Sequence, residues 1–247
     1  MSDIGKYLTP TPMLDFRDQR LQNLIQQRGW RDLSRYDAIE SIYTFVRDEI
    51  PFGYNADDRL PASAVLKDGY GQCNTKGTLL AALFRGVGIP ARFHGFTIYN
   101  ALQRGAIPEY LFVLAPERII HSWVEIFFEE RWINLEGFIV DRPYLERIQA
   151  AFGEFERFSG YGIATRHLSS PPVDWQGEDT FIQREGIADD LGVYSDPDHF
   201  YRQYGSNLSG IKKLLFRYLI RHLMNVNVAR IRRRGVSKRK LTRKRHA

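Results

Sequence analysis

The chain has 247 residues, with 35 Lys or Arg, 29 Asp or Glu, six His and one Cys. This length is enough to bury one large core. A single cysteine excludes an intramolecular disulfide and any cysteine-rich zinc site, and the histidines show no paired ligand spacing. The first residues contain no apolar signal-peptide centre, and no run approaches the ~18 apolar residues of a membrane span. We therefore expect a cytoplasmic protein that needs no metal and no other cofactor.

The only cysteine, Cys73, ends a glycine-rich approach, 68–72, and precedes the apolar segment 78–84. This pattern predicts a helix that begins near the thiol. The unpaired backbone N–H groups and the positive end of the dipole at a helix start favour the thiolate, the form that attacks a carbonyl carbon. The alternative is an inert, half-buried structural thiol. Because Cys73 lies at the polar start of the apolar segment and not inside it, its position favours a nucleophilic role over a structural one.

Residues 118–137 are dominated by β-branched and aromatic side chains and are interrupted by the charged pair Glu129-Glu130. The pattern predicts two antiparallel strands. If the turn is centred on that pair and has an even number of residues, Phe127 faces Trp132 across the ladder. An odd-numbered turn would move every later side chain to the opposite face.

The even register places His121 on the same face as Glu136, one diagonal step away. Such neighbours are roughly 7–8 Å apart at the backbone, close enough for a glutamate to reach an imidazole N–H. A carboxylate there would fix the tautomer of the histidine, as the third member of a nucleophilic triad does. A strand histidine taken alone is also compatible with a hydrogen-bonded core residue.

The thiol, the histidine strand and the carboxylate together resemble the transglutaminase-like superfamily, cysteine enzymes related in fold and chemistry to papain-type proteases. The resemblance runs from about Tyr36 to Asp141. It is carried by residues 36–50, 62–73, 80–92, 121–125 and 132–136. It implies an α+β, papain-like fold in which the Cys73 helix packs on an antiparallel sheet. It also implies acyl transfer by the triad Cys73, His121 and Glu136.

The sequence departs from the family pattern at two places, around Glu136 and at residues 74–77 directly after the nucleophile. Glu136-Gly137 stands where the family most often has aspartate and a proline-containing turn, so Asp141 is a rival for the third position. Asn74 follows the nucleophile in place of a more usual small or charged residue, and we expect this change to bear on substrate choice.

Four further residues are candidates for oxyanion stabilisation or substrate binding: Tyr54, Gln72, His94 and Trp123. The backbone N–H of Cys73 is the natural first oxyanion donor. The alternatives are a buried structural tyrosine at position 54, a glutamine at 72 that points away, and a hydrogen-bonded strand histidine at 94.

Charge is distributed unevenly, because residues 211–247 carry 14 Lys or Arg and no acid, which leaves the preceding residues at −8. Eight residues from Ile211 to Val226 fall at helical spacing and predict an amphipathic helix packed on the core. We therefore expect a catalytic domain at 1–168, an extension with this helix at 169–231, and a disordered basic tail at 232–247. The tail would make weak electrostatic contact with nucleic acid or an anionic membrane surface.

Three functions are compatible with these features. The first is hydrolysis of a peptide or amide bond by a small cysteine hydrolase acting on peptide or protein substrates. The second is protein crosslinking or amine transfer by a transglutaminase. The third is a catalytically quiet binding module recruited by its basic tail. The sequence names neither the substrate nor the oligomeric state.

Overall fold

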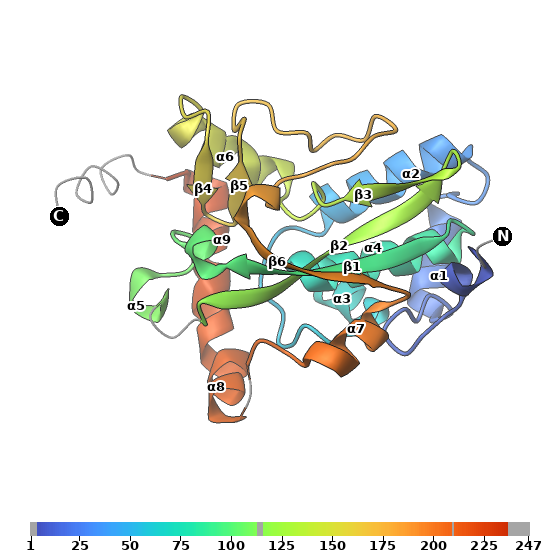
Figure 1. Cartoon of the computed structure of the whole chain (residues 1–247), viewed down its shortest axis with the longest axis horizontal. Helices are drawn as coiled ribbons and strands as arrows, with labels where there is room; N and C mark the ends of the chain where they lie inside the picture. The colour runs from blue at the N-terminus through green and yellow to red at the C-terminus, as the bar shows by residue number, and fades with distance from the viewer. Residues whose placement is uncertain (1–3, 113–115, 209, 237–247) are drawn as a thin grey trace.

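The computed structural model describes residues 4–112, 116–208 and 210–236 (Figure 1). Its centre is an antiparallel four-stranded sheet in the order β3-β2-β1-β6, and a two-stranded ladder pairs β4 with β5. The strands are β1 (Ala91–Tyr99), β2 (Arg118–Phe128), β3 (Arg131–Leu135), β4 (Phe158–Gly160), β5 (Ile163–Thr165) and β6 (Ile187–Tyr194). Helices surround this sheet, which confirms the predicted α+β class.

The helices fall into an N-terminal group, a middle group and a C-terminal group. The N-terminal group is η1 (Ile4–Leu8), α1 (Gln19–Gln27), α2 (Arg35–Thr44), η2 (Phe45–Glu49), α3 (Ala62–Asp68) and α4 (Cys73–Gly86). The middle group is η3 (Asn100–Gln103), α5 (Glu109–Phe112), α6 (Arg142–Phe152) and η4 (Arg184–Gly186). The C-terminal group is α7 (Pro197–Tyr204), α8 (Gly210–Leu215), η5 (Phe216–Ile220) and α9 (Arg221–Arg234).

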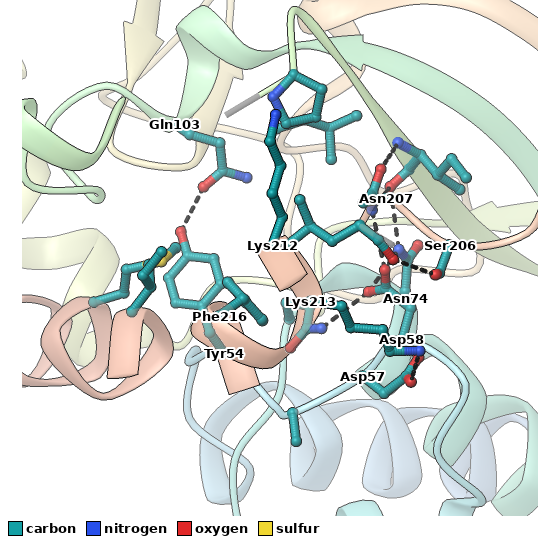
Figure 2. A pocket seen from close by; sticks show the side chains of 18 of the residues that line it. Tyr54, Asp57, Asp58, Asn74, Gln103, Ser206, Asn207, Lys212, Lys213 and Phe216 are labelled. Carbon is teal, nitrogen blue, oxygen red and sulfur yellow. Dashed lines mark hydrogen bonds and ion pairs between the residues drawn. The ribbon is translucent and has the colours of Figure 1, made fainter. Parts of the chain in front are cut away.

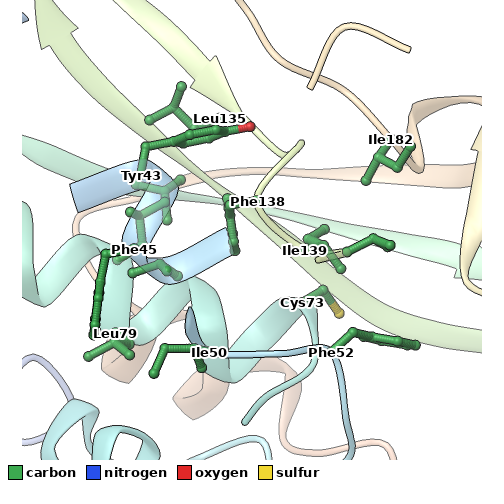
Figure 3. Close-up of a cluster of buried hydrophobic side chains, with 14 of the residues drawn as sticks. Tyr43, Phe45, Ile50, Phe52, Cys73, Leu79, Leu135, Phe138, Ile139 and Ile182 are labelled. Carbon is green, nitrogen blue, oxygen red and sulfur yellow. The ribbon is translucent and has the colours of Figure 1, made fainter. Parts of the chain in front are cut away.

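Helix α4 is the central helix of the molecule. Its residues from Cys73 to Arg85 are all buried, because β1 and β2 cover one side while α1, α2 and α3 cover others. A helix enclosed in this way needs apolar or small residues around its whole circumference, and the segment 77–84 supplies them. Figure 3 shows Cys73 at the edge of the resulting apolar cluster, near Phe52 and Ile139. The predicted packing of the nucleophile helix on an antiparallel sheet is confirmed.

The turn into α4 requires one of its glycines. A Cβ at Gly71 would lie 2.8 Å from Oγ1 of Thr75 and 2.9 Å from Cγ of Lys76, closer than real Cβ atoms approach. The chain therefore enters the helix so tightly that only glycine fits two residues before the thiol. This close approach fixes where the first turn of α4 begins.

The β2–β3 hairpin has the register that the sequence predicts. Phe127 pairs with Trp132, and the turn contains Glu129 and Glu130. These two glutamates have φ values of 47° and 60°, the left-handed region that a two-residue hairpin turn demands of its central residues. Glu136 directly follows the end of β3.

The sheet crosses the boundary predicted between residues 168 and 169. Strand β6, which comes from the segment assigned to the extension, pairs antiparallel with β1 and forms one edge of the main sheet. Helix α7 then packs on β1, where a Cβ at Gly95 would overlap the ring of Phe200. Residues from the predicted extension thus complete the core that the catalytic segment begins.

The C-terminal helices do not use the apolar face that the sequence predicts. The residues buried in α9 are Met224, Val228 and Ile231, whereas Ile211 and Tyr218 of the predicted face point to solvent. The apolar side chains occupy too much of the circumference for spacing alone to select the packed side. Among the described helices, none combines the length and apolarity needed to cross a bilayer.

The predicted start of the tail at residue 232 lies inside α9. The Arg232 side chain is bound to Asp141 and to the carbonyl of Phe52, so the helix continues to Arg234. Disorder predicted for the remaining tail concerns residues 237–247, which lie outside the described part of the chain.

Candidate active site

His121 and Glu136 meet in the core as the hairpin register predicts. Nε2 of His121 lies 2.9 Å from Oε1 of Glu136, and both side chains are fully buried. Because a carboxylate only accepts hydrogen bonds, the shared proton belongs to Nε2 of the imidazole. Nδ1 of His121 has no hydrogen-bond partner among the described residues and is the ring atom left for the thiol.

The second oxygen of Glu136 is held by backbone groups. Oε2 accepts hydrogen bonds from the N–H groups of Ile182 and Gln183, each at 2.9 Å. The backbone of Glu136 itself donates to the carbonyl of Thr180 at 3.0 Å. The carboxylate therefore has one oxygen free for His121 and a fixed orientation from the segment that precedes η4. This segment compensates for the extra freedom of a glutamate in place of an aspartate.

Charge at the site favours a protonated histidine. Burial lowers the pKa of His121, but the neighbouring Cys73 thiol and the Glu136 carboxylate outweigh it and raise that pKa to about 9. A histidine shifted in this direction keeps its proton at neutral pH and can pair with a thiolate. Cys73 is 7% exposed and opens onto a pocket, whereas His121 lies behind it.

Asn74 connects the nucleophile helix to the histidine strand. Its Nδ2 donates to the carbonyl of Ile120 at 3.1 Å, and its Oδ1 accepts from Oγ of Ser122 at 2.9 Å. These two partners flank His121 in the sequence. Asn74 therefore sets the position of β2 relative to the first turn of α4, and no sequence signal indicated this role.

A half-buried carboxylate organises the other side of the first turn. Oδ1 of Asp58 accepts hydrogen bonds from Nε2 of Gln72 and Nδ2 of Asn74, and Oδ2 accepts from Nδ2 of Asn207. Burial raises the pKa of Asp58, although the three amide donors oppose that shift. Since Asn207 also accepts from the backbone N–H of Ile120, this cluster joins α4, β2 and the segment before α8.

The pocket in front of Cys73 has a cavity volume of about 180 Å³. Figure 2 shows residues that line it, among them Tyr54, Gln103 and Phe216 from η5. Most lining side chains from the C-terminal helices are apolar: Leu215, Phe216, Ile220 and Met224. Asp57 and Lys213, also at the wall, form an ion pair with each other. The C-terminal segment therefore closes the pocket with a mainly apolar surface.

Tyr54 and Gln72 lie at the pocket, and their polar atoms are engaged. The hydroxyl of Tyr54 donates to Oε1 of Gln103 at 2.5 Å, and its backbone is held by Asn225 through two hydrogen bonds. Burial raises the pKa of Tyr54, as does the nearby Cys73. The side chain of Gln72 binds Asp58 and the N–H of Asn55, so both of its polar atoms have partners within the chain.

His94 and Trp123 do not line the pocket. Nδ1 of His94 lies 2.6 Å from Oε1 of Glu125, and its Nε2 lies 3.0 Å from Oδ1 of Asp190. The indole N–H of Trp123 donates to Asn134. Burial lowers the pKa of His94, but the two carboxylates raise it overall. The proposed substrate-binding role of these two residues is thus corrected to a structural cluster on the sheet.

The rival carboxylate, Asp141, is used elsewhere. Its side chain caps α6 by accepting from the N–H of Tyr144, and it also accepts from the N–H of Phe52 and from Arg232. Burial would raise the pKa of Asp141, but Arg232 and these donors lower it. The structure gives Asp141 no hydrogen bond to His121, which instead binds Glu136.

A second buried charge lies one turn after Cys73. Nζ of Lys76 donates to the carbonyls of Arg47 and Ile139 at 3.0 and 3.1 Å. Burial lowers the pKa of Lys76 to about 7, although Asp141 opposes the shift. Lys76 thereby ties the segment that follows Glu136 to the nucleophile helix.

The arrangement can perform nucleophilic acyl chemistry. The first-turn N–H groups of α4 have no partners inside the helix and can receive an oxyanion formed at a carbonyl attacked by Cys73. His121 can deliver a proton to a leaving group, and Glu136 steadies the imidazolium. Among the described residues, no cluster of three or more His, Cys, Asp or Glu side chains suits a metal ion.

Sequence reasoning missed the residues that act through backbone groups or long-range packing. Ile182 and Gln183 orient Glu136 by their N–H groups, which every residue other than proline carries, so no side-chain pattern could identify them. Asp58 and Asn207 lie 149 residues apart, and only the fold brings them into contact.

Comparison with known proteins finds one family model that matches part of the chain. Residues 25–137 match the model of the transglutaminase-like superfamily. No curated protein sequence matches the chain. One solved structure, described as a "putative cysteine protease" from Cytophaga hutchinsonii, is 14% identical with a TM-score of 0.49, and the match covers 80% of this chain and 49% of that one. Red sea bream transglutaminase is 13% identical with a TM-score of 0.32, over 95% of this chain and 41% of that one.

The chain thus spans about half the length, or less, of these solved structures. The matched residues 25–137 contain Cys73, His121 and Glu136, and they end directly after the carboxylate. The family match and the site together support a thiol-dependent enzyme in the general sense. Residues 25–137, a little under half of the chain, are similar to the transglutaminase-like superfamily, and over that segment the resemblance predicted from the sequence is confirmed.

Proposed function

We propose that the chain hydrolyses peptide or other amide bonds through a thioester on Cys73. The observation that carries this proposal is the buried pair of His121 and Glu136, with the carboxylate locked by two backbone donors behind a thiol that opens onto a pocket. An inert thiol in a binding module would need neither a polarised histidine nor a fixed carboxylate in the core, since burying both is costly.

The proposed reaction has two steps. Sγ of Cys73 bonds to the carbonyl carbon, the C–N bond breaks, and the amine leaves with the proton that His121 held. Water then attacks the thioester, its proton passes to His121, and the C–S bond breaks to release the carboxylic acid and regenerate the thiolate. The backbone N–H of Cys73 stabilises the oxyanion in both steps, an interaction worth on the order of 3 kcal/mol.

Hydrolysis is favoured over amine transfer because the two acidic side chains at the pocket, Asp57 and Asp58, already have partners within the chain. A primary amine acceptor would be attracted by carboxylates near the thioester. Asp57 is paired with Lys213, and Asp58 is bound by three amide groups of the chain. Water needs no such recognition, so the acyl enzyme is set up to react with water.

The test combines a small activated ester with a protein substrate. We expect p-nitrophenyl acetate to acetylate Cys73 of the wild type, as detected by the mass of the peptide that contains it, and not Cys73→Ala. Denatured casein is then incubated with and without dansylcadaverine. New casein peptides with free carboxyl ends support hydrolysis, and fluorescent casein of unchanged length supports amine transfer.

Three outcomes separate the alternatives. Peptide release that requires Cys73 and is insensitive to the added amine supports the proposal. Amine incorporation that requires Cys73 would replace it with the crosslinking function. Absence of acetylation at Cys73, with the wild type folded by circular dichroism, would overturn both and leave the binding module.

A further inference from the structure

The helices at the C-terminal end present two apolar stripes. Helices α8, η5 and α9 follow one another without interruption from Gly210 to Arg234. The inner stripe includes Met224, Val228 and Ile231, which pack on the main core. In Figure 1, α9 crosses one end of the sheet and α8 lies at the lower edge of the molecule.

The outer stripe contains seven of the thirteen exposed large hydrophobic residues in the described part of the chain. Ile211, Tyr218 and Val226 are 82%, 70% and 67% exposed, and the remaining members are Leu214, Leu219, Leu223 and, at the edge next to the pocket that it also lines, Leu215. Fifteen positions separate Ile211 from Val226, a length of about 22 Å along a helix. Monomeric proteins seldom expose a contiguous apolar stripe without a partner for it.

The charged residues within this run of helix all have one sign, and two of them, Lys213 and Arg232, are paired with Asp57 and Asp141 of other segments. Residues 211–236 contain eight Lys or Arg and no Asp or Glu, and residues 237–247 add six more in the sequence. Arg217, Arg230 and Arg233 are among the exposed members. The surface therefore combines aliphatic side chains with cations over a single run of helix.

This combination selects among possible partners. The same face of a second copy would bring cations against cations, which costs free energy in the absence of acids. Nucleic acid would meet aliphatic groups where it needs aromatic platforms, and Tyr218 is the one exposed aromatic residue in the run from 210 to 236. A bilayer with anionic lipids accepts both components, since acyl chains take up the apolar side chains while headgroups pair with Lys and Arg.

We propose that the outer face of α8, η5 and α9, from Ile211 to Val226, docks on the surface of an anionic lipid bilayer. The helix lies in the plane of the interface and does not span it. Because the inner side of the same helices lines the pocket through Phe216 and Ile220, docking places the entrance to Cys73 beside the lipid surface. The docking itself does not depend on the proposed hydrolysis.

The experiment is co-sedimentation of the full chain with vesicles. One set contains phosphatidylcholine alone, and the other contains phosphatidylcholine mixed with phosphatidylglycerol. The test variant is Ile211→Gln/Leu214→Gln/Tyr218→Gln, and the matched control is Leu33→Gln/Tyr99→Gln, which changes exposed apolar residues elsewhere on the surface. A chain that ends at residue 236 separates the helix face from the basic tail. Circular dichroism and thermal unfolding establish that each variant is folded.

We expect the wild type to bind mixed vesicles at least about tenfold more tightly than neutral ones. The triple variant should lose about tenfold or more of that affinity, while the control stays within about twofold and the shortened chain still depends on the apolar residues. Equal binding by the triple variant and the wild type overturns the proposal, as does absence of binding to mixed vesicles. A wild-type dimer that the triple variant converts to monomer would assign the face to a second copy, and retention on duplex DNA that only Arg217→Gln/Arg230→Gln/Arg233→Gln abolishes would assign it to nucleic acid.

Discussion

The two sides of Cys73 are built in different ways. Behind the thiol, His121 and Glu136 are fully buried and fixed by hydrogen bonds to strands and backbone groups. In front of it, the pocket wall comes from C-terminal helices whose inner side is apolar and whose outer side faces solvent. The contrast teaches that Cys73, His121 and Glu136 all lie in the segment that matches the superfamily, while residues after that segment add the apolar C-terminal part of the pocket wall.

The largest expected effect lies behind the thiol. Glu136→Gln keeps the shape but removes the charge that steadies the imidazolium, so we expect turnover of p-nitrophenyl acetate to fall roughly 1000-fold, equal to about 4 kcal/mol. The apparent KM should change little, because the pocket wall is untouched. The measurement is steady-state kinetics, with the urea unfolding midpoint as a check on folding. A turnover close to that of the wild type would remove Glu136 from the mechanism.

The next-largest effect tests how helix α9, which forms part of the pocket wall, is attached to the core. Asp141→Asn breaks a pair in which the carboxylate is buried and bound by Arg232, so we expect the free energy of unfolding to fall by roughly 3 kcal/mol. Arg233→Met, at an exposed neighbouring position, should change it by less than about 0.5 kcal/mol. Urea unfolding measures both variants. If Asp141→Asn instead reduced turnover as strongly as Glu136→Gln without loss of stability, the assignment of the two carboxylates would be reversed.

The pH dependence of stability isolates the charge on His121. Its folded pKa of about 9 exceeds the ordinary 6.5, so its stabilising contribution is complete below pH 6.5 and is lost as pH rises through 9. We expect the advantage of the wild type over His121→Gln to shrink by on the order of 2 kcal/mol across that window.

The buried Lys76 acts in the opposite direction, because a pKa lowered to about 7 makes its contribution grow as pH rises from 7 toward 10.5. The wild type and the His121→Gln variant both keep Lys76, so its contribution cancels in the difference between their free energies of unfolding. Urea titrations at several pH values give the two free energies. An advantage that stays constant between pH 6.5 and 9 would contradict the raised pKa of His121.

A smaller effect is expected for Asn74, which connects the first turn of α4 to strand β2. Asn74→Ala removes the hydrogen bonds to Ile120 and Ser122 that flank His121, so we expect kcat to fall about tenfold, or about 1.4 kcal/mol, with KM nearly constant. The sequence predicted that this residue bears on substrate choice. A change in KM or in preference among ester chain lengths, with kcat unchanged, would favour that prediction over the positioning role.

The smallest effect is expected for the end of the chain. Removing residues 237–247 takes away charge without apolar periodicity, so the free energy of unfolding should change by less than about 0.5 kcal/mol. Removing residues 232–247 should cost much more, because Arg232 is bound to Asp141. Thermal unfolding of the two shortened chains makes the comparison. Equal stability of both would mean that the Arg232 contact contributes nothing.

The fold class, the hairpin register and the pairing of His121 with Glu136 could be predicted from the sequence. Strand periodicity is two residues, so one correctly placed turn at Glu129-Glu130 determines which side chains share a face. The packed side of the C-terminal helices could not be predicted in this way. Apolar residues lie on two sides of that helix, and the π turn of η5 shifts the phase between Leu215 and Arg221.

The residues that hold the site residues in place could not be predicted from the sequence either. Asp58 and Asn225 are single polar residues in segments without a recognisable pattern, and their roles depend on contacts across the whole fold. His94 illustrates the converse case: the sequence left open a place at the cleft and a hydrogen-bonded strand histidine, and the structure shows the second, with both ring nitrogens next to carboxylates. Local spacing cannot distinguish these cases, because it contains no information on the packing of distant segments.

The contact between Tyr54 and Asn225 has a consequence for how the protein is made. The two residues are 171 positions apart, and Asn225 holds both backbone polar groups of Tyr54 beside the nucleophile. On the ribosome, the thiol, the histidine and the carboxylate are all synthesised long before α9 leaves the exit tunnel. A nascent chain therefore has Cys73, His121 and Glu136 available while its pocket is still incomplete, because the helices that complete the pocket wall are synthesised after them. The late, non-local closure also predicts slow final folding compared with the helical N-terminal part.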